Sequence, residues 1–223
     1  MQLSVYLFED QAIKAALQPL TQHRQVAELW VGTSTLENKW PHLVSSPENA
    51  DIQVMSSLLP LTSTFELLDQ LPTDTCYIYQ GQMLAQRGKG TTTIEKHLPF
   101  LNHPEELLNF QSEFLRAEIK GNNPAPGNNT FICSEEIYIH PSASVKGSML
   151  DASLGPIYIG EGVNIQIGTL IQGPAALLKD ATTNIGAKIR PNTTIGPGCK
   201  VGGEINHCIF FPFSNKAHDG YLG

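Results

Sequence analysis

The sequence predicts an α/β domain followed by a solenoid of six-residue repeats, and two observations in the second half of the chain predict the solenoid. Between Ile159 and Val201 an aliphatic residue returns at every sixth position, with only Thr183 out of type. Four residues after each of the first seven repeat positions comes a small or slim side chain. A helix needs apolar residues about every 3.6 positions and a strand every 2, so a period of six indicates a coil that turns a corner after each short strand. The aliphatic positions are Ile159, Ile165, Ile171, Leu177, Ile189, Ile195 and Val201, and the small ones are Val163, Thr169, Ala175, Ala181, Ala187, Thr193 and Cys199.

Each repeat is interpreted as one short strand and one corner, with the large aliphatic side chain pointing inward. This spacing resembles the hexapeptide repeat of left-handed parallel β-helix proteins, in which three repeats make one triangular coil of about eighteen residues. Burying one Ile or Leu contributes roughly 1.5–3 kcal/mol, so the stability of such a domain comes from stacking coils on one another. Ile139 and Val145 have the same spacing two places out of phase. We therefore expect residues 149–156 to be a loop or bulge that resets the register.

The first half of the chain has an α/β pattern. Short apolar runs at Leu3 to Phe8 and Cys76 to Tyr79 fit buried strands, and Asp10 to Leu17 fits the start of a helix. Helix-like spacing of apolar residues recurs from Leu58 to Leu71 and from Pro104 to Ile119. Strands that alternate with helices in this way predict a domain with a sheet covered by helices.

The predicted linker is the segment 121–130, because its sequence, GNNPAPGNNT, consists almost wholly of turn and breaker residues. We therefore expect a first domain of residues 1–120, which can hold a small core, and a β-helix of residues 131–223. A solenoid that stopped at Gly223 would leave unpaired strand groups and an open aliphatic core exposed. For this reason we expect the β-helix to be truncated here and the native polypeptide to continue.

Composition and charge exclude several classes of protein. With 14 basic and 21 acidic residues, a net charge of −7 argues against a nucleic-acid-binding surface. The N-terminal apolar run is too short for a signal peptide, and no stretch approaches the roughly 18 apolar residues of a membrane span, so we expect a cytoplasmic protein. The four cysteines show no C-x-x-C spacing, and we interpret them as core or corner residues in preference to a metal site.

The stretch from Leu20 to Gly32, LTQHRQVAELWVG, carries a family resemblance. It is similar to the PLT…RPva…rvG opening of bacterial sugar nucleotidyltransferase-like proteins that also contain a hexapeptide β-helix. These are related to the bifunctional uridyltransferase/acetyltransferase that makes UDP-N-acetylglucosamine. Residues 137–141 (IYIHP) and 155–160 (GPIYIG) resemble the start of that family's β-helix. The resemblance is weak over residues 1–120 and strong over residues 131–223.

Nucleotidyl transfer needs a loop that cradles phosphates, a basic residue that neutralises them and an acidic residue that holds Mg²⁺. The G-x-G-T-R loop of the resembled enzymes is missing, because the segment from Phe8 to Ala12 contains no glycine. Their Asn-Gly-Asp motif reads Gln80-Gly81-Gln82, which replaces the metal-holding carboxylate by an amide. Arg24 is a candidate phosphate contact, or else a solvated loop residue. One interpretation is a reduced domain that binds its ligand without turning it over.

The stretch 214–223, SNKAHDGYLG, resembles the S-K-A-G-H-L-T-Y-L-G stretch of the acetyltransferase domain in the bifunctional enzyme. The resemblance implies that His218 is the general base on a sugar amine, that Tyr221 contacts the amino sugar and that Arg190 binds the sugar phosphate. Imidazole suits proton removal because its pKa lies near the working pH, and a guanidinium can pair with two phosphate oxygens. The second phosphate-binding lysine of the family falls near Asn206, which leaves Lys216 as its candidate substitute.

Simpler interpretations stand beside these roles. His218 taken alone is a loop histidine, and Arg190 is an outward-facing residue on one side of the solenoid. His207 falls at a repeat position and indicates a locally broken coil in preference to a ligand. The phenylalanines beside it cover that break or form an oligomer contact; they are Phe210, Phe211 and Phe213.

We therefore expect a sugar-phosphate transferase of the bifunctional type in nucleotide-sugar synthesis, with nucleotidyl transfer implied for the first domain and acyl transfer for the β-helix. The alternative is a non-catalytic sugar-nucleotide-binding or scaffold protein that oligomerises through the β-helix. The resemblance implies acetyl-CoA and Mg²⁺ as cofactors, although the coils that bind coenzyme A in the family are missing from these 223 residues. It also implies a sugar phosphate or nucleotide sugar as ligand and a homotrimer as the assembly.

Overall fold

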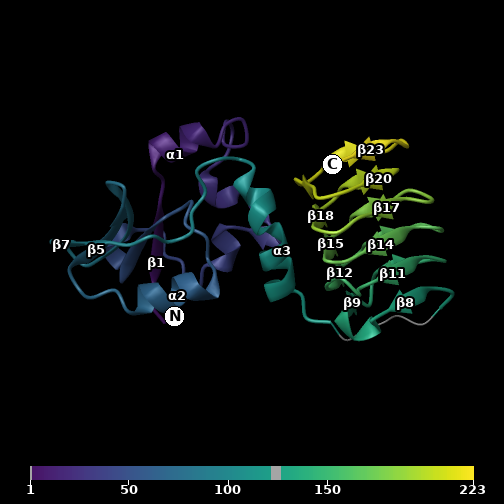
Figure 1. Ribbon diagram of the computed structural model, residues 1–223, viewed down its shortest axis with the longest axis horizontal. Coiled ribbons are helices and arrows are strands. Elements are labelled where there is room, and N and C mark those ends of the chain that lie inside the picture. The colour runs from purple at the N-terminus through teal and green to yellow at the C-terminus, as the bar shows by residue number, and fades with distance from the viewer. Residues whose placement is uncertain (1, 122–126) are drawn as a thin grey trace. The chain divides into compact units, whose positions relative to one another are not determined.

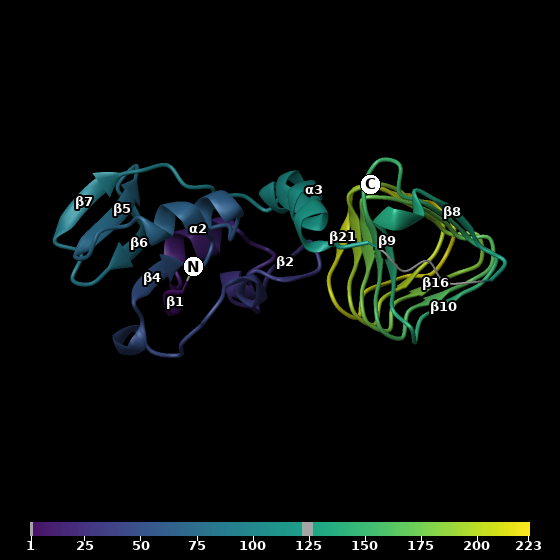
Figure 2. The same cartoon turned by 90° about the horizontal axis from the view of Figure 1, so that it is seen from below.

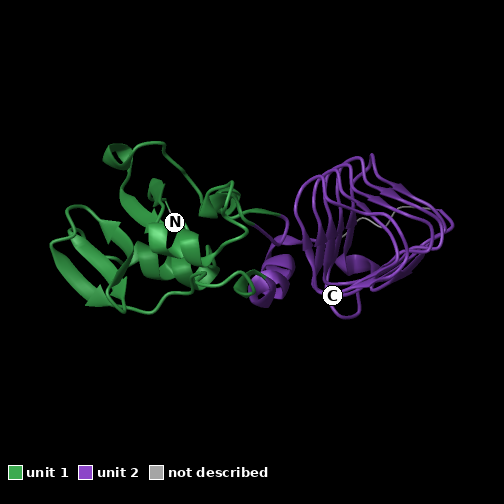
Figure 3. Cartoon of the chain, turned by 90° about the horizontal axis from the view of Figure 1, so that it is seen from above, with its two compact units in different colours: residues 1–29, 34–107 green, residues 30–33, 108–223 purple. Residues whose placement is uncertain are grey.

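The computed structural model describes residues 2–121 and 127–223, and the chain forms two compact units (Figures 1 and 3). The first unit holds the residues up to Leu29 and Ser34–Leu107, and the second holds Trp30–Thr33 and Leu108–Gly223. Most of the helix α3 (Glu106–Glu118) thus groups with the β-helix, whereas the sequence-based boundary placed this helix in the first domain. Of the expected linker at 121–130, residues 122–126 lie outside the described residues. No helix in the described ranges is long and apolar enough to cross a membrane.

The first unit contains a mixed five-stranded sheet in the order β1-β4-β6-β5-β7. Strand β1 runs parallel to β4 and β5 runs parallel to β7, while β6 is antiparallel to both of its neighbours. The strands are β1 (Val5–Phe8), β4 (Ile52–Met55), β5 (Thr75–Tyr79), β6 (Gln82–Arg87) and β7 (Thr92–Glu95), and the helices are α1 (Gln11–Ala16) and α2 (Thr62–Asp69). Short segments complete the first half of the chain, namely β2 (Trp30–Val31), β3 (Ser34–Thr35) and 3-10 helices at Val26–Glu28, Glu37–Lys39 and Pro47–Asn49.

The helix α1 begins where the sequence predicts. Asp10 is its N-cap, and its carboxylate accepts hydrogen bonds from the backbone N–H groups of Ala12 at 2.9 Å and Ile13 at 3.0 Å. These bonds satisfy two of the donors that a helix N-terminus leaves free. Ile13 and Leu17 are buried on the inner side. The prediction of a mixed α/β region in the first half of the chain is confirmed.

The second unit is a left-handed parallel β-helix, and Figure 2 shows its coils end on with a three-sided outline. Its strands stack in register into three parallel sheets, and in the regular coils Asn164 pairs with Thr182 and Thr182 with Lys200. One sheet has the order β10-β13-β16-β19-β22, the second β8-β11-β14-β17-β20-β23 and the third β9-β12-β15-β18-β21. The bounds are β8 (Thr130–Ile132), β9 (Ile137–Ile139), β10 (Ser144–Val145), β11 (Met149–Asp151), β12 (Ile157–Ile159), β13 (Asn164–Ile165), β14 (Leu170–Gln172), β15 (Ala175–Leu177), β16 (Thr182–Thr183), β17 (Lys188–Ile189), β18 (Thr193–Ile195), β19 (Lys200–Val201), β20 (Glu204–Ile205), β21 (Ile209–Phe210), β22 (Asn215–Lys216) and β23 (Tyr221–Leu222), with a 3-10 helix at Ser134–Glu136.

The residues at the six-residue repeat positions form the core of this unit. The aliphatic positions from Ile159 to Val201 are all buried, and so are the small residues that follow them. Thr183, which stands at a repeat position without being aliphatic, is also fully buried. Its hydroxyl lies 2.9 Å from that of Thr169 and accepts a hydrogen bond from the backbone N–H of Gln166 at 3.1 Å. A polar side chain fits this aliphatic column because its hydrogen bonds are satisfied inside the core.

The coils are irregular at both ends of the stack. Residues 149–156 were predicted to be a loop or bulge that resets the register, and the register does change within them. The prediction was wrong for Met149–Asp151, which form the strand β11 with Leu150 fully buried. The additional residues lie between this strand and β12, where the chain leaves the regular spacing. Near the other end, Lys188 pairs with Glu204, so this coil is two residues shorter than the regular ones. His207 follows between β20 and β21, where Thr194 pairs with Ile209 and the spacing is three residues short of the regular coil. Its φ of 52° fits the predicted local break.

Of the phenylalanines beside His207, the structure assigns different environments to two. Phe210 is buried and closes the end of the aliphatic core. Phe213 is 83% exposed. Phe210 is therefore part of the β-helix core, and Phe213 lies on the surface.

The helix α3 packs beside β12, β15 and β18 through a small apolar cluster of Leu115, Ile119, Ala176 and Leu178 (Figure 1). A buried polar group joins the same helix to residues 30–33. Gly32 donates its N–H to the Gln111 Oε1 at 2.8 Å, and its carbonyl accepts from the Thr194 hydroxyl at 2.7 Å. The Gln111 Nε2 donates to the same hydroxyl at 2.5 Å, which closes the network. These bonds explain why a short segment far away in sequence belongs to the β-helix unit.

Candidate functional site

A hollow of about 280 Å³ lies beside β1 in the first unit. The parallel strands β1 and β4 end next to each other, at Phe8 and Met55. Ligands of α/β proteins bind at the carboxyl ends of parallel strands, so this is where a nucleotide site is expected. The lining residues come from these strands and from the loops after them, namely Tyr6, Leu7, Glu9, Gln25, Ala27, Glu37, Leu43, Val44, Ser45 and Ser56.

Ser56 is the lining residue whose bonding is incomplete. It follows β4 directly, and its backbone N–H donates to the carbonyl of Phe8 at 2.8 Å. Its side chain is only 3% exposed, and its hydroxyl has no hydrogen-bond partner among the described residues. An unpartnered buried hydroxyl costs about 1–3 kcal/mol. A polar ligand atom in the hollow would therefore gain a hydrogen bond that the protein itself does not use.

The outer edge of β1 offers a second polar contact. Val5 directs its N–H to the carbonyl of His42 at 3.0 Å and its carbonyl to the N–H of Val44 at 2.9 Å. In a strand, the N–H and C=O groups of every second residue point to the same edge. The N–H and C=O of Leu7 therefore point to the same edge of β1 as those of Val5, toward the hollow. Within residues 2–121 and 127–223 no backbone group is bonded to Leu7 on this edge. The N–H and C=O of Leu7 can together form hydrogen bonds with an acceptor and a donor on the edge of a nucleobase.

The position after β1, where the resembled enzymes carry a glycine-rich loop, is held by a carboxylate. Glu9 pairs with the Lys14 ammonium at 2.7 Å through Oε1 and accepts from the backbone N–H of Val26 at 3.0 Å through Oε2. Glu9 thus ties α1 to the 3-10 helix at Val26–Glu28. With both of its oxygens engaged, its role is to hold the wall of the hollow in place.

The charges around this hollow favour a neutral polar group over a phosphate. Its charged lining residues are Glu9 and Glu37, and no Lys or Arg is among the lining residues. Arg24 is half-buried, takes part in an interaction of its own and lies outside the lining set. Nowhere in the described ranges do three or more His, Cys, Asp or Glu residues form a group that could hold a metal ion. The side chains around the hollow therefore do not fit a resident Mg²⁺ held by the protein alone.

A second candidate site lies on the β-helix, on the sheet that contains β11, β14 and β17. Arg190 is 52% exposed there, and its Nη1 lies 3.4 Å from the Glu204 Oε1. Asp151 accepts a hydrogen bond from the Gln172 Nε2 at 3.3 Å, and hydrogen bonds from Ser153 lower the pKa of Asp151 below its usual value. A hollow of about 300 Å³ on this sheet is lined by Met149, Asp151, Leu170, Ile171, Gln172, Lys188, Ile189 and Arg190.

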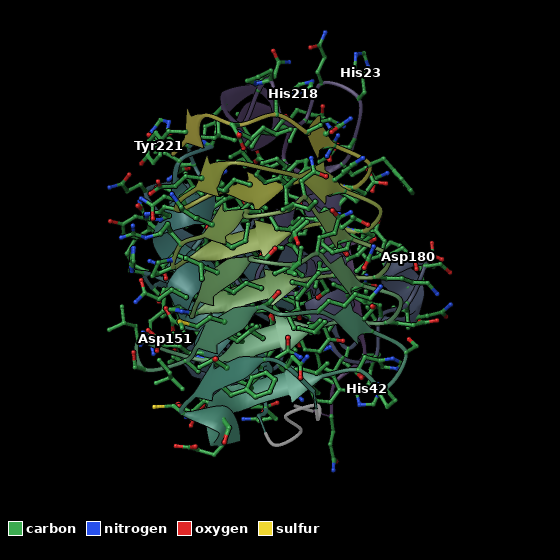
Figure 4. The ribbon with its side chains drawn as sticks, turned by 90° about the vertical axis from the view of Figure 1, so that its right-hand side faces the viewer. His23, His42, Asp151, Asp180, His218 and Tyr221 are labelled. Carbon is green, nitrogen blue, oxygen red and sulfur yellow. The ribbon has the colours of Figure 1, made fainter. Side chains whose placement is uncertain are left out.

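The structure places Tyr221 on the same sheet as Arg190. The strand β17, which ends just before Arg190, pairs with β20, and β20 pairs with β23, which begins at Tyr221. Adjacent strands lie about 4.8 Å apart, so the two backbones are separated by roughly two strand spacings. The amide of Asn206 approaches the hydroxyl of Tyr221 at 3.5 Å. His218 lies in the turn before β23 and is exposed (Figure 4).

Lys216 has a different environment from the one expected of a phosphate ligand. Its ammonium donates to the carbonyl oxygens of Gly202 at 2.7 Å, His218 at 2.8 Å and Gly220 at 3.0 Å. An ammonium has three donors, so all three are used by the backbone. Lys216 thereby fixes the turn that carries His218, and in this arrangement it has no donor left for a phosphate.

Sequence reasoning missed Ser56 and the neighbours of Arg190. Ser56 gives no signal in the sequence, because its importance comes from an unpartnered hydroxyl in a hollow. Gln172 and Lys188 were predictable in principle. The regular coil repeat places Lys188 beside Leu170 on the sheet of Arg190, and tracing that register along the chain would have found it.

The fold and these two sites define a protein with an α/β unit and a β-helix, each of which carries a hollow lined by polar and apolar residues. Comparison with protein families matches residues 5–55 to a family described as sugar nucleotidyl transferase. The matched segment runs from β1 to β4, contains the other residues that line the first hollow and ends one residue before Ser56. The match supports a nucleotidyltransferase-type role. No curated protein matches the chain.

Proposed function

We propose that the protein acts on a nucleotide sugar or its precursors, and that the hollow beside β1 binds the nucleoside part of this ligand. The observation that carries the proposal is the coincidence of the family match at residues 5–55 with a hollow that presents the buried, unpartnered hydroxyl of Ser56. The reaction is transfer of a nucleotidyl group to a sugar phosphate, as the matched family's description suggests.

The chemistry of the lining supports a base or ribose in this position. Leu7 offers a backbone donor and acceptor, and Ser56 offers a hydroxyl that can donate or accept. The carboxylate of Glu37 repels phosphates from the hollow and can accept hydrogen bonds from ribose hydroxyls. The phosphates then extend away from the hollow, where Mg²⁺ from solution would neutralise them.

Calorimetric titration of the protein with UTP and with UDP-N-acetylglucosamine tests the binding step. Ser56→Ala should weaken binding about five- to tenfold, as the loss of one hydrogen bond predicts. Ser57→Ala is the matched control, because Ser57 is also fully buried and unpartnered within the described residues but does not line the hollow. Equal affinities for the two variants would contradict the placement of the ligand.

A pyrophosphate-release assay with UTP and a sugar phosphate then separates the transferase from the non-catalytic alternative. Turnover supports nucleotidyl transfer. Tight nucleotide binding without turnover favours a sugar-nucleotide-binding or scaffold protein, for which the engaged Glu9 and the missing glycine-rich loop already argue.

A second candidate function is acyl transfer on the β-helix. It is favoured by the placement of Arg190 and Tyr221 on one sheet, with His218 in the turn that leads to Tyr221. In this proposal Arg190 binds the phosphate of an amino-sugar phosphate and His218 removes the proton from the amine. Acetyl-CoA supplies the acyl group.

The test follows thiol release from acetyl-CoA in the presence of glucosamine 1-phosphate. His218→Ala should lower the rate at least a hundredfold if the imidazole is the general base. His140→Ala, which changes a histidine on the first coil, is the control and should retain the rate. A homotrimer is part of this proposal, and light scattering of the purified protein measures it directly.

A further inference from the structure

A third hollow, of about 330 Å³, lies within the β-helix unit on the sheet of β12 and β15, beside the end of α3. It is on a different sheet from Arg190 and Tyr221. Aromatic, apolar and charged side chains share its lining, which consists of Trp30, Thr33, Glu118, Tyr158, Glu161, Leu178, Lys179 and Pro197.

Two aromatic side chains form the apolar part of this hollow. Trp30 and Tyr158 are both partly buried and pack against the cluster of Leu115, Ile119, Ala176 and Leu178. The ring of Tyr158 is also stacked on that of Tyr138 from the preceding coil, with ring centroids 5.2 Å apart and an interplanar angle of 8°. The stacking fixes the orientation of Tyr158, so the hollow has a preformed aromatic wall.

The polar part of the hollow combines acceptors and donors at close range. Glu118 accepts from the N–H and the hydroxyl of Thr33, both at 2.7 Å, which holds its carboxylate at the rim. Glu161 pairs with the Lys179 ammonium at 3.1 Å. Burial, the neighbouring Tyr138 and the charge of Glu161 raise the pKa of Tyr158, so its phenol stays protonated at neutral pH. Within the described part of the chain this hydroxyl has no hydrogen-bond partner.

This combination distinguishes between classes of ligand. An anion in the hollow would face the carboxylates of Glu118 and Glu161, and a cation would face the ammonium of Lys179. A neutral hydroxyl group avoids both conflicts, because it can donate to the carboxylate of Glu161 and accept from Lys179 at the same time. Several hydroxyls on one ring, with an apolar face that covers an aromatic side chain, are the chemistry of a sugar.

We propose that this hollow is a binding site for a neutral sugar ring, which packs against Trp30 and Tyr158 and hydrogen-bonds to Glu161, Lys179 and the phenol of Tyr158. Pockets of this kind bind through an apolar wall and a few placed polar groups. The site is separate from the two sites of the proposed function, so it stands whether or not those bind their ligands.

The two tryptophans of the chain allow a direct test by NMR of the indole N–H signals of the whole protein. Trp40 is buried in the first unit and is an internal reference. Trp30→Phe assigns the two signals. Titration with glucose, galactose and N-acetylglucosamine should shift the Trp30 signal to saturation for at least one sugar and leave the Trp40 signal unchanged.

Variants locate the site. Tyr158→Phe and Glu161→Gln should each weaken the titration roughly two- to tenfold, as removal of one hydrogen bond predicts. Tyr138→Phe keeps the stacked ring and changes a residue that does not line the hollow, so it should leave the affinity unchanged. Trp30 belongs to the same unit as the substituted residues, so an unchanged Trp30 signal in each variant without sugar shows that the β-helix unit is intact.

Three results would overturn the proposal. The first is an absence of saturable shifts of the Trp30 signal with every sugar. The second is a saturable shift with tetramethylammonium or inorganic phosphate in place of the sugars, which would indicate an ion site. The third is an equal sugar affinity for Tyr158→Phe and the unmodified protein, which would place the sugar elsewhere.

Discussion

Replacing Thr194 with valine removes one hydroxyl from the buried network that joins α3 and residues 30–33 to the β-helix. The side chain is fully buried, and valine has nearly the same shape, so the substitution leaves no cavity. Two polar groups lose their partner, namely the amide nitrogen of Gln111, which is also fully buried, and the carbonyl of Gly32. Each buried group left unpartnered costs about 1–3 kcal/mol, so the loss of two partners should destabilise the network by about 2–6 kcal/mol.

Hydrogen exchange at the backbone amide of Gly32 measures this loss locally. That amide donates to the Gln111 Oε1 and is released only when the network opens, so its exchange rate gives the free energy of opening without an assumption of two-state unfolding. Thr193→Val is the control. Thr193 is equally buried, but its hydroxyl makes only a 3.4 Å bond to the carbonyl of Pro191. If Thr194→Val changed the Gly32 exchange no more than Thr193→Val does, the assigned network would be wrong.

Two further substitutions test the backbone and the charges. Gly32→Ala should lower the stability of the β-helix unit by more than 1 kcal/mol, because Gly32 has a φ of 61° and a Cβ there would lie 2.8 Å from the Cβ of Phe114. Gly186→Ala, at a φ of 70° with no atom within 4 Å of the added Cβ, is the control for backbone strain alone, and denaturant unfolding compares the two. Ser153→Ala should raise the pKa of Asp151 toward its ordinary value of 3.8, and an NMR titration of the carboxyl measures this shift. Because the folded pKa of Asp151 is lowered, its stabilising contribution is present above pH 3.8 and is lost as the pH falls through the folded pKa, and the variant should show a smaller loss.

The architecture of the second half of the chain was predictable because it depends on a period. Each coil repeats the same geometric demand, an inward aliphatic side chain and a small residue at the corner, and the two demands are visible together along the sequence. The column at Thr183 shows the limit of this reasoning. Thr183 is polar at a position where the pattern requires an aliphatic residue, yet Thr169 and Gln166 complete its hydrogen bonds in the core. Such compensation depends on neighbours one coil away and is not written in the local sequence.

The place of residues 30–33 could not be predicted, because it depends on contacts between distant segments. In the sequence Gly32 closes a family-like stretch that begins in the α/β unit, and nothing nearby indicates a partner in the β-helix. The partner is a face with small side chains, where Ala176 and Thr194 occupy the positions that Tyr158 holds on the earlier coil. Small residues on an outward face are a signal of close packing, and a search for them would have suggested that an element covers β15 and β18.

The last ten residues resemble the acetyltransferase stretch for two different reasons. Some of them lie where a ligand site requires, and one is explained by the geometry of the coil. Tyr221 and His218 lie beside the sheet of Arg190, as a shared ligand site requires. Lys216 was the candidate substitute for a phosphate-binding lysine, yet its ammonium is engaged by three carbonyl oxygens of the final turns. A lysine at this point is thus explained by the geometry of the coil, without reference to a substrate. The match of the stretch as a whole is therefore weaker support for acyl transfer than its length suggests. The support that remains comes from Arg190, His218 and Tyr221, which the geometry of the coil does not require.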